Sequence, residues 1–594
     1  MARPVLSFLL LLLATTTSTA AQSAPKSPAD VAFEKLAARY VDEYAAISPV
    51  GATQLGDHRF DARLDDVSPA ARRREAAFYR RFLASLGKID RGKLSRENRV
   101  DYEVLRHALQ SGQWSLTELQ EWAWNPLVYT GLAGQSIYGL VARDFAPWPE
   151  RLRHVTARLQ QIPTLLAQAR RNLEAARVPQ VHAETAVKQN PGLISILDEM
   201  VTPHLGELSG ADRAHLEKAM GRARAATEEQ QTWLETQLLP NAKGNFRIGG
   251  AKFDRKLGFT LHTPLTRQQI RERAQRELDR IHGQMYDVSK TIYLQQYPHT
   301  RFPQHPEEAY KQAITRAALE VAYRDLPDRE KIVETAKSYL AEATEFVRGK
   351  GFVEVPSEPV DVIVMPEYAR GVSVAFCDSP GPLDKNQKTF YAVAPLPADW
   401  TSEQVRSFLR EYNDYSLREL TIHEAMPGHY LQIAISNRFP STLRAVLYSG
   451  PFVEGWAVYA ERVMADEGFL GGDPRMKLIQ LKWYLRGVTN ALMDQAIHVD
   501  GMSREEAMKL MVEGGFQEER EAALKWVRAQ LSSTQLSTYF VGYQEHADLR
   551  HAAEEKAGRG FDLRKYHDAV LAHGSPPVQF VRALVLDQPI PNAR

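Results

Sequence analysis

Helical periodicity constrains the fold of this chain more than any other feature of its sequence. Apolar residues recur at three- and four-residue steps, as they do on one face of an amphipathic helix. Helices are predicted on this basis, or from charged helical composition, at 31–44, 152–173, 211–240, 266–293 and 328–351. We therefore expect a mainly α protein, with Asp328 as the N-cap of the last of these helices and Ser503 and Glu506 forming a capping box further on.

Strand signals are few and lie close together. Three β-rich runs, 360–366, 371–378 and 389–395, are separated by turn residues and come shortly before His423. They predict one small β-sheet next to the helix that carries the motif described below. The edge of such a sheet can pair with an extended peptide backbone, and a sheet with no ligand role explains the pattern equally well.

The first 21 residues have the layout of a secretory signal peptide. They contain one basic residue, Arg3, an apolar run at 5–14, and small residues up to Ala21. The run is shorter than the roughly 20 residues that span a bilayer, and no cysteine follows it for lipid attachment. We expect an exported protein, periplasmic or secreted, with no membrane span in the mature chain; a retained membrane anchor is the less favoured alternative.

After the signal peptide, the best division is a helical region at 22–245 and a catalytic region at 246–594. Cys377 is the only cysteine, so no disulfide can form within the chain. The formal charge is +1 and falls to zero without Arg3, which argues against nucleic acid as a partner. Nothing in the sequence sets the oligomeric state.

Residues 423–432 read "HEAMPGHYLQ" and suggest a metal site. Six residues turn a regular helix by about 600°, which would place His429 roughly 120° around the helix from His423. This helix cannot be regular, because Pro427 lacks an N–H and its ring would clash with the preceding turn. Gly428 adds conformational freedom. We therefore predict a bulge or break between Ala425 and Gly428 that brings His429 back towards His423.

A third ligand is expected from the segment "EGWAVYAE", which offers Glu454 and Glu461. The two lie two turns apart on one helix, roughly 10 Å along its axis, so one metal ion can reach only one of them. We choose Glu454, because it lies among apolar residues and next to Gly455, where a neighbouring segment could approach. Glu461 is then an outer-sphere or helix-surface carboxylate, and its loss should leave metal content near normal.

The segments "HEAMPGH", "EGWAVYAE", "LSTYFVGYQE" and "FDLRKYHDAVLAHGSPP" resemble the family called domain of unknown function 885. Its pattern, H-E-x-x-P-G-H followed by E-G-W-A-x-Y-x-E, matches here at every named position, and the similarity covers most of the mature chain. That family in turn resembles helical zinc peptidases of the thimet oligopeptidase, carboxypeptidase Taq and angiotensin-converting enzyme type, although the six-residue spacing departs from their H-E-x-x-H. The resemblance implies an elongated, nearly all-α fold with a deep cleft, Zn²⁺ at its floor and short peptides as substrates.

Roles for the candidate residues follow from this chemistry. His423, His429 and Glu454 would hold Zn²⁺, which polarises the scissile carbonyl and lowers the pKa of its water to about 7. Glu424 would accept a proton from that water and pass it to the leaving amine. The resemblance also implies a tyrosine, often with a histidine, that stabilises the oxyanion. The candidates are Tyr539, then Tyr543 and His573, each of which is open to a purely structural explanation.

One further carboxylate could orient a zinc-bound imidazole without touching the metal. Asp494 and His498 lie one helical turn apart, and Asp494 is the candidate for that outer role. A polar pair internal to one helix explains the two residues equally well.

The leading hypothesis is thus an exported zinc metallopeptidase. A zinc amidase acting on a non-peptide or modified-peptide substrate is one alternative, and a catalytically inactive peptide-binding protein of the same fold is another. A serine hydrolase built on Ser373 is disfavoured, because "GVSVA" ends in Ala375 and lacks the strand-turn-helix context of a nucleophile elbow.

Overall fold

The protein is described by a computed structural model that covers residues 26–365, 374–384 and 387–592. The predicted signal peptide at 1–21 lies outside these residues, and so does Ser373. Within the described part of the chain, no helix is long and apolar enough to cross a membrane.

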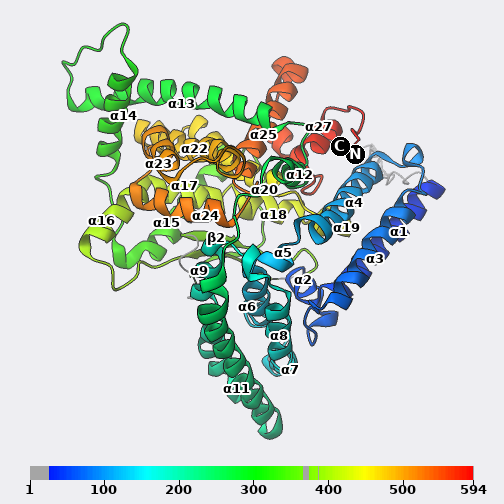
Figure 1. Ribbon diagram of the computed structural model, residues 1–594. Helices are drawn as coiled ribbons and strands as arrows, with labels where there is room; N and C mark the ends of the chain where they lie inside the picture. The colour runs from blue at the N-terminus through cyan, green and yellow to red at the C-terminus, as the bar shows by residue number, and fades with distance from the viewer. Residues whose placement is uncertain (1–25, 366–373, 385–386, 593–594) are drawn as a thin grey trace, which may run out of the picture.

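The first part of the chain is built from helices, which lie to the right and below in Figure 1. They are α1 (Pro28–Ile47), α2 (Pro49–Gln54), α3 (Pro69–Leu86), α4 (Arg96–Trp114), α5 (Glu121–Trp124), α6 (Leu127–Val141), α7 (Trp148–Leu159), α8 (Ile162–Asn172), α9 (Gln180–Gln189), α10 (Gly192–Ile196) and α11 (Gly210–Trp233). Phe33, Leu36 and Tyr40 are buried on one face of α1, as their spacing predicts.

One of the predicted helices is divided. The segment 152–173 forms two helices, α7 and α8, that meet at Gln160 and Gln161. Pro163 lies in the first turn of α8. It has no N–H to continue the hydrogen bonding of a preceding helical turn, so the chain starts a new helix there.

The second part of the chain adds the sheet and the remaining helices. These helices are α12 (Gly250–Leu261), α13 (Arg267–Gln296), α14 (Glu308–Ala322), α15 (Ile332–Lys350), α16 (Ser402–Glu411), α17 (Asp414–Glu424), α18 (His429–Ser436), α19 (Thr442–Val446), α20 (Gly450–Asp466), α21 (Phe469–Gly472), α22 (Pro474–Gln495), α23 (Arg504–Lys509), α24 (Glu519–Leu531), α25 (Ser537–Ala557), α26 (Leu563–Leu571) and α27 (Val578–Val585). Ser503 and Glu506 form the predicted capping box at the start of α23. Asp328 caps a short 3₁₀ turn that leads into α15.

The sheet has three strands, β1 (Val360–Val364), β2 (Ala375–Asp378) and β3 (Thr389–Val393), in the order β1-β3-β2. β1 is parallel to β3, and β2 is antiparallel to it at one edge. The amide of Ala394 donates to the carbonyl of Val374 at 2.9 Å. Because pairing alternates along an antiparallel ladder, the amide of Cys377 faces away from β3, towards the free edge. The mainly α fold with one small sheet is as the sequence predicts.

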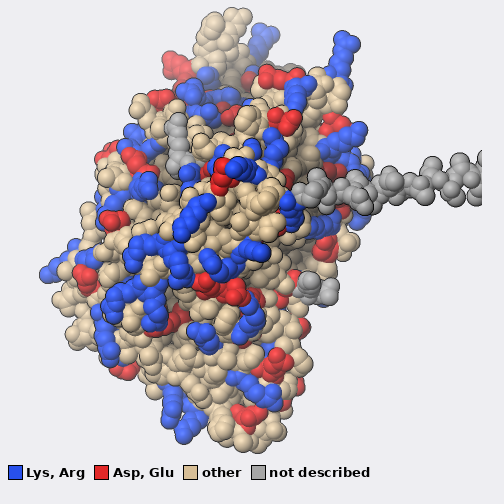
Figure 2. Space-filling model, turned by 90° about the vertical axis from the view of Figure 1, so that its right-hand side faces the viewer, with Lys and Arg blue, Asp and Glu red and all other residues tan. Residues whose placement is uncertain are grey.

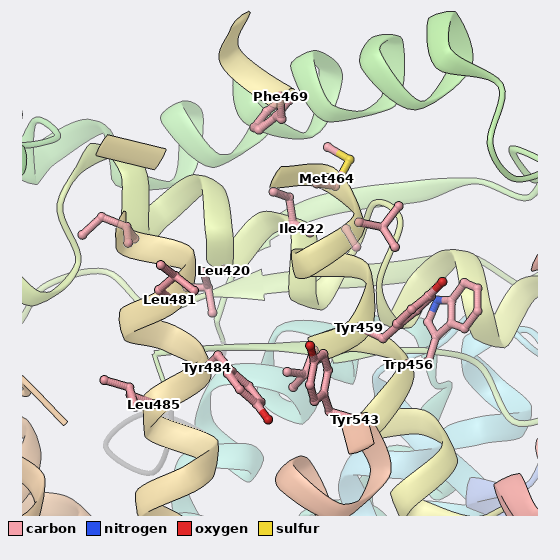
Figure 3. Close-up of a cluster of buried hydrophobic side chains, with 14 of the residues drawn as sticks. Leu420, Ile422, Trp456, Tyr459, Met464, Phe469, Leu481, Tyr484, Leu485 and Tyr543 are labelled. Carbon is pink, nitrogen blue, oxygen red and sulfur yellow. The ribbon is translucent and has the colours of Figure 1, made fainter. Parts of the chain in front are cut away.

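The largest buried cluster lies in the second part of the chain, between α17, α20, α22 and α25. Figure 3 shows its aromatic members, with Tyr484 beside Tyr543 and Trp456 beside Tyr459. This cluster begins at Phe253, close after the boundary expected near residue 245. The division into two regions stays a prediction.

Helices α20 and α25 cross at two glycines. A Cβ atom added to Gly455 would lie 2.2 Å from the carbonyl carbon of Gly542, and one added to Gly542 would lie 2.0 Å from the carbonyl oxygen of Pro451. Neither position can carry a side chain, so the two helix backbones touch directly. This contact fixes where the side chains that flank it on each helix, Glu454 and Tyr539, come to lie.

Charged side chains of both signs are interspersed on the face that carries α1, α3 and α4 (Figure 2). Several of them form ion pairs there, such as Arg81 with Glu43 and Arg74 with Asp66. Mixed charge of this kind agrees with the nearly neutral composition.

Candidate metal centre

The helix that carries the motif is broken where Pro427 and Gly428 predict a break. α17 ends at Glu424 and α18 begins at His429. Ala425 has φ −128° and ψ −77°, and Gly428 has φ −75° and ψ −127°, so neither is helical. The amide of Gly428 turns back and donates to the carbonyl of Ile422 at 2.9 Å. The reversal brings His429 beside His423, with their ring centroids 4.7 Å apart.

Gly428 is required by packing as well as by backbone geometry. A Cβ atom at this position would lie 2.0 Å from the carbonyl oxygen of His423 and 2.4 Å from that of Ile422. Both neighbours are backbone atoms of the helix that ends there and cannot rotate away.

Gly428→Ala is therefore expected to lower stability by about 1–3 kcal/mol, the usual cost of overpacking. The midpoint of denaturant unfolding measures this effect. Gly283→Ala is the matched control, because a Cβ there meets nothing within 4 Å and alanine is the better helix former by about 1 kcal/mol. Equal midpoints for Gly428→Ala and the unmodified protein would contradict the packing argument.

Two imidazoles and one carboxylate converge at the break. Oε2 of Glu454, on α20, lies 3.6 Å from Nε2 of His423 and 3.5 Å from Nε2 of His429. One potential ligand atom from each residue falls within 4.8 Å of the other two. Burial raises the pKa of Glu454, but the two imidazoles outweigh it and hold that pKa below its ordinary value. Glu454, chosen over Glu461 from the sequence, is the glutamate that completes this cluster.

The geometry and the donor set fit a zinc ion. Oε2 of Glu454 is buried and has no hydrogen-bond partner among the described residues, and such an atom is costly to leave unpaired. Two ligands bound tetrahedrally at zinc distances lie about 3.3–3.4 Å apart, close to the separations of 3.5 and 3.6 Å. Imidazole nitrogen and carboxylate oxygen are both common zinc ligands.

A second layer of carboxylates supports His423. Its Nδ1 pairs with Oε1 of Glu461 at 2.6 Å, and that carboxylate is only 2% exposed. The contact favours the tautomer with a proton on Nδ1 and leaves Nε2 free to bind a metal. Glu419, fully buried one turn before His423, lies against Glu461; burial and this neighbour raise its pKa well above the ordinary value.

Glu424, the candidate general base, faces both the cluster and the sheet. The amide of Cys377, on the free edge of β2, donates to its Oε2 at 2.9 Å. Burial raises the pKa of Glu424, and the charges of His423 and His429 act in the opposite direction. The same contact places the free edge of β2 next to the cluster.

Tyr539, on α25, lies close enough to Glu454 for the two groups to interact electrostatically. Its hydroxyl accepts hydrogen bonds from Arg528 at 3.0 Å and from Gln535 at 3.4 Å. Burial and the charge of Glu454 raise the pKa of Tyr539, so the hydroxyl keeps its proton and can donate it. Arg528 also interacts electrostatically with Glu454.

Two other candidates lie elsewhere. Tyr543 is buried in the aromatic cluster of Figure 3, where its hydroxyl accepts from Arg462 at 3.1 Å. His573 lies after α26 and pairs with Glu97 of α4 at 3.3 Å. Tyr543 therefore contacts the core, and His573 contacts an N-terminal helix.

Asp494 does not orient a histidine of the cluster. Its carboxylate accepts from the amides of Thr534 and Ser537, at 2.9 and 3.2 Å, and from the hydroxyl of Ser537. It thereby holds the start of α25, the helix that carries Tyr539. Glu461 makes the contact with His423 that the sequence proposed for Asp494, because α20 packs against α17 at this point.

Three features of the candidate site were missed by sequence reasoning. They are Glu419, Arg528 and the amide of Cys377. Glu419 carries a usable signal, since it precedes His423 by four residues and so shares its helix face. Arg528 and the Cys377 amide carry none, because both reach the site through contacts between distant segments.

A cavity of about 730 Å³ adjoins β2 on the side of the N-terminal helices. It is lined by Phe376 and Asp378 of β2 and by residues of α2, α6 and α10. Cys377, between these two strand residues, faces Glu424. The cavity has the volume of a small-molecule site. The deep cleft implied by the resemblance stays a prediction.

The fold and the site define a mainly helical protein with a half-buried cluster of two histidines and one glutamate. The chain belongs to the family described as bacterial protein of unknown function (DUF885), whose model matches residues 49–585. The family resemblance stated from the motifs is thus confirmed.

Two solved structures are similar over nearly the whole chain. A "putative lipoprotein of unknown function" from Shewanella oneidensis is 33% identical, with a TM-score of 0.78 and coverage of 93% of this chain and 99% of that one. The "putative lipoprotein" from Colwellia psychrerythraea is 19% identical, with a TM-score of 0.75 and coverage of 94% and 99%. A search of curated proteins found no match.

Proposed function

We propose that the protein is a zinc-dependent hydrolase that cleaves amide bonds of short peptides. The observation that carries the proposal is the convergence of His423, His429 and Glu454 within 4.8 Å, next to the carboxylate of Glu424, which interacts electrostatically with all three. Two histidines, a glutamate and a neighbouring carboxylate form the donor set and base of a hydrolytic zinc site. The motif's resemblance to helical zinc peptidases supports the same class.

The chain's own residues account for each step that the protein must perform. Zinc held by the three ligands would polarise the scissile carbonyl and lower the pKa of a water molecule to about 7. Glu424 accepts the proton of the attacking water and delivers it to the leaving amine. The hydroxyl of Tyr539 donates to the oxygen on which negative charge develops. Arg528 and Gln535 hold that hydroxyl by donating to its oxygen.

The sheet edge supports an extended peptide as the substrate. The amide of Cys377 faces away from β3 and towards Glu424, and an extended chain can add to such an edge through backbone hydrogen bonds. Phe376 and Asp378 of the same strand line a cavity of about 730 Å³. Export to the periplasm or the medium is part of the proposal, in keeping with the signal-peptide pattern and with the lipoprotein descriptions of the two similar structures.

The experiment combines metal analysis of the purified protein with digestion of a peptide library, read by mass spectrometry. We expect about one zinc ion per chain, cleavage of short peptides, loss of cleavage with a chelator and recovery on adding zinc. A zinc-loaded protein that cleaves none of the peptides would contradict the proposal. Binding without cleavage would then support the peptide-binding alternative, and turnover of non-peptide amides would support the amidase.

A further inference from the structure

The sheet and the N-terminal helices are joined by a cluster of hydrogen bonds at the end of β2. Arg143, just after α6, donates through Nη2 to the backbone carbonyl of Asp378 at 2.8 Å and to its Oδ1 at 2.5 Å. Through Nη1 it donates to the carbonyl of Lys388 at 2.7 Å. The hydroxyl of Tyr138, on α6, donates to Oδ2 of Asp378 at 3.0 Å.

One guanidinium thus holds both β2 and β3 at the end where the two strands are connected. Asp378 is the last residue of β2, and Lys388 immediately precedes β3. The side chain of Arg143 is only 11% exposed, and its guanidinium lies over the ring of Phe390, 5.2 Å from the centroid. The planar fork serves these acceptors in one fixed geometry, which the single amine of a lysine does not reproduce.

Strand β2 makes few sheet contacts of its own. It has four residues and, among the described residues, pairs with β3 alone. Segments with few contacts open locally at a low cost in free energy. The connection that follows β2 also rests on the N-terminal helices, since the amide of Leu383 donates to the carbonyl of Leu55 at 2.9 Å. A Cβ atom at Gly381 would lie 2.3 Å from the carbonyl carbon of Leu55, so the two backbones touch there.

The residue before Asp378 is the one that contacts the candidate general base. The amide of Cys377 points to the free edge of β2 and donates to Oε2 of Glu424 at 2.9 Å. Consecutive residues are joined by a rigid, planar peptide unit. A shift of Asp378 therefore displaces the amide that holds the carboxylate of Glu424.

We propose that Arg143 and Tyr138 are positioning residues that hold Glu424 through β2, so that the N-terminal helices set the orientation of the candidate general base. This inference rests on the proposed function and deepens it. The path runs from the two side chains to Asp378, along the strand to the amide of Cys377, and from there to Glu424. Since the amide holds Oε2 of Glu424, Oε1 is the oxygen that accepts the proton of the attacking water.

Hydrogen exchange at the amide of Cys377 measures this path directly, because that amide donates to Glu424. The rate is read by mass spectrometry with peptide fragmentation, and the measurement needs no substrate. Arg143→Met keeps an apolar stem and removes the donated hydrogen bonds, so we expect exchange at least about tenfold faster. Tyr138→Phe removes one hydrogen bond with little change of volume and should raise the rate by about threefold. Glu424→Ala, which removes the acceptor, gives the upper limit of the rate.

Asn172→Ala is the matched control, because it loosens the N-terminal helices without touching the sheet. Asn172 donates to the carbonyl of Val67 at 2.8 Å and to the hydroxyl of Tyr129 at 3.1 Å. Its loss should leave exchange at Cys377 within about twofold of the parent rate. An unchanged rate in both Arg143→Met and Tyr138→Phe would overturn the inference. An equal increase in Asn172→Ala would also overturn it, by assigning the effect to general loosening of these helices.

The proposed function and this inference fail in different ways. In Arg143→Met, kcat/KM for peptide cleavage should fall at least about tenfold while the zinc content stays unchanged, because the ligands are intact and only the base is misplaced. Full activity in a variant whose Cys377 amide exchanges rapidly would leave the hydrolase proposal intact and remove the link from β2 to Glu424. A protein that cleaves no peptide would remove the proposed function, and the exchange rates would still decide whether α6 holds β2 against Glu424.

Discussion

Glu454→Ala is expected to remove most of the zinc affinity of the purified protein. Its Oε2 lies 3.5–3.6 Å from both imidazole nitrogens and makes no hydrogen bond within the described part of the chain, so the variant leaves two histidines to hold the ion. Losing an outer-sphere partner typically weakens metal binding by about 10–100-fold, and losing a ligand should exceed that range. Titration with zinc against a competing chelator, followed by elemental analysis, measures the loss.

Glu461→Ala provides the matched comparison, since it removes a buried glutamate from the same helix. From the sequence alone, this variant is predicted to keep near-normal zinc content. The structure revises that expectation, because Glu461 bonds Nδ1 of His423 at 2.6 Å. We now expect a loss of about 10–100-fold in affinity, smaller than that of Glu454→Ala. If Glu461→Ala proves the more damaging of the two, the ligand assignment is wrong.

Glu424→Gln is expected to reduce kcat/KM for peptide hydrolysis by about 10²–10⁴-fold, the usual contribution of a general base. The amide oxygen can still accept from the amide of Cys377, so the local structure and the zinc content should persist. Steady-state kinetics on a peptide identified in the library digest measures the change, with metal analysis of the same sample.

Glu419→Gln is the control, because it changes a buried carboxyl on the same helix, α17. Because burial and Glu461 raise the pKa of Glu419 well above its ordinary value, the site favours the neutral form of this side chain, which glutamine resembles. Its effect on kcat/KM should therefore be much smaller than that of Glu424→Gln. Retention of the parent rate by Glu424→Gln would exclude this residue as the proton acceptor.

Local sequence signals determined the helices, the sheet and the break in the helix that carries His423. The apolar spacing of Phe33, Leu36 and Tyr40 specifies a helix whatever surrounds it, since the periodicity of the backbone is local. Pro427 and Gly428 likewise exclude a regular helix by their own covalent structure. Pro163 carries the same kind of information, and it explains why one long predicted helix became α7 and α8.

The composition of the candidate site depended on contacts that only the tertiary structure provides. The sequence left Glu454 and Glu461 to be chosen by context, and it offered Asp494 for a contact that Glu461 makes. Arg528 and the amide of Cys377 reach the site from α24 and from β2, each across a packing interface. Such contacts follow from how helices and strands pack, as at Gly455 and Gly542, where the absence of side chains lets α20 and α25 touch. The sequence by itself therefore determined which segments form and where one of them breaks. The tertiary structure decided which side chains meet, because packing between distant segments has no periodic signature along the chain.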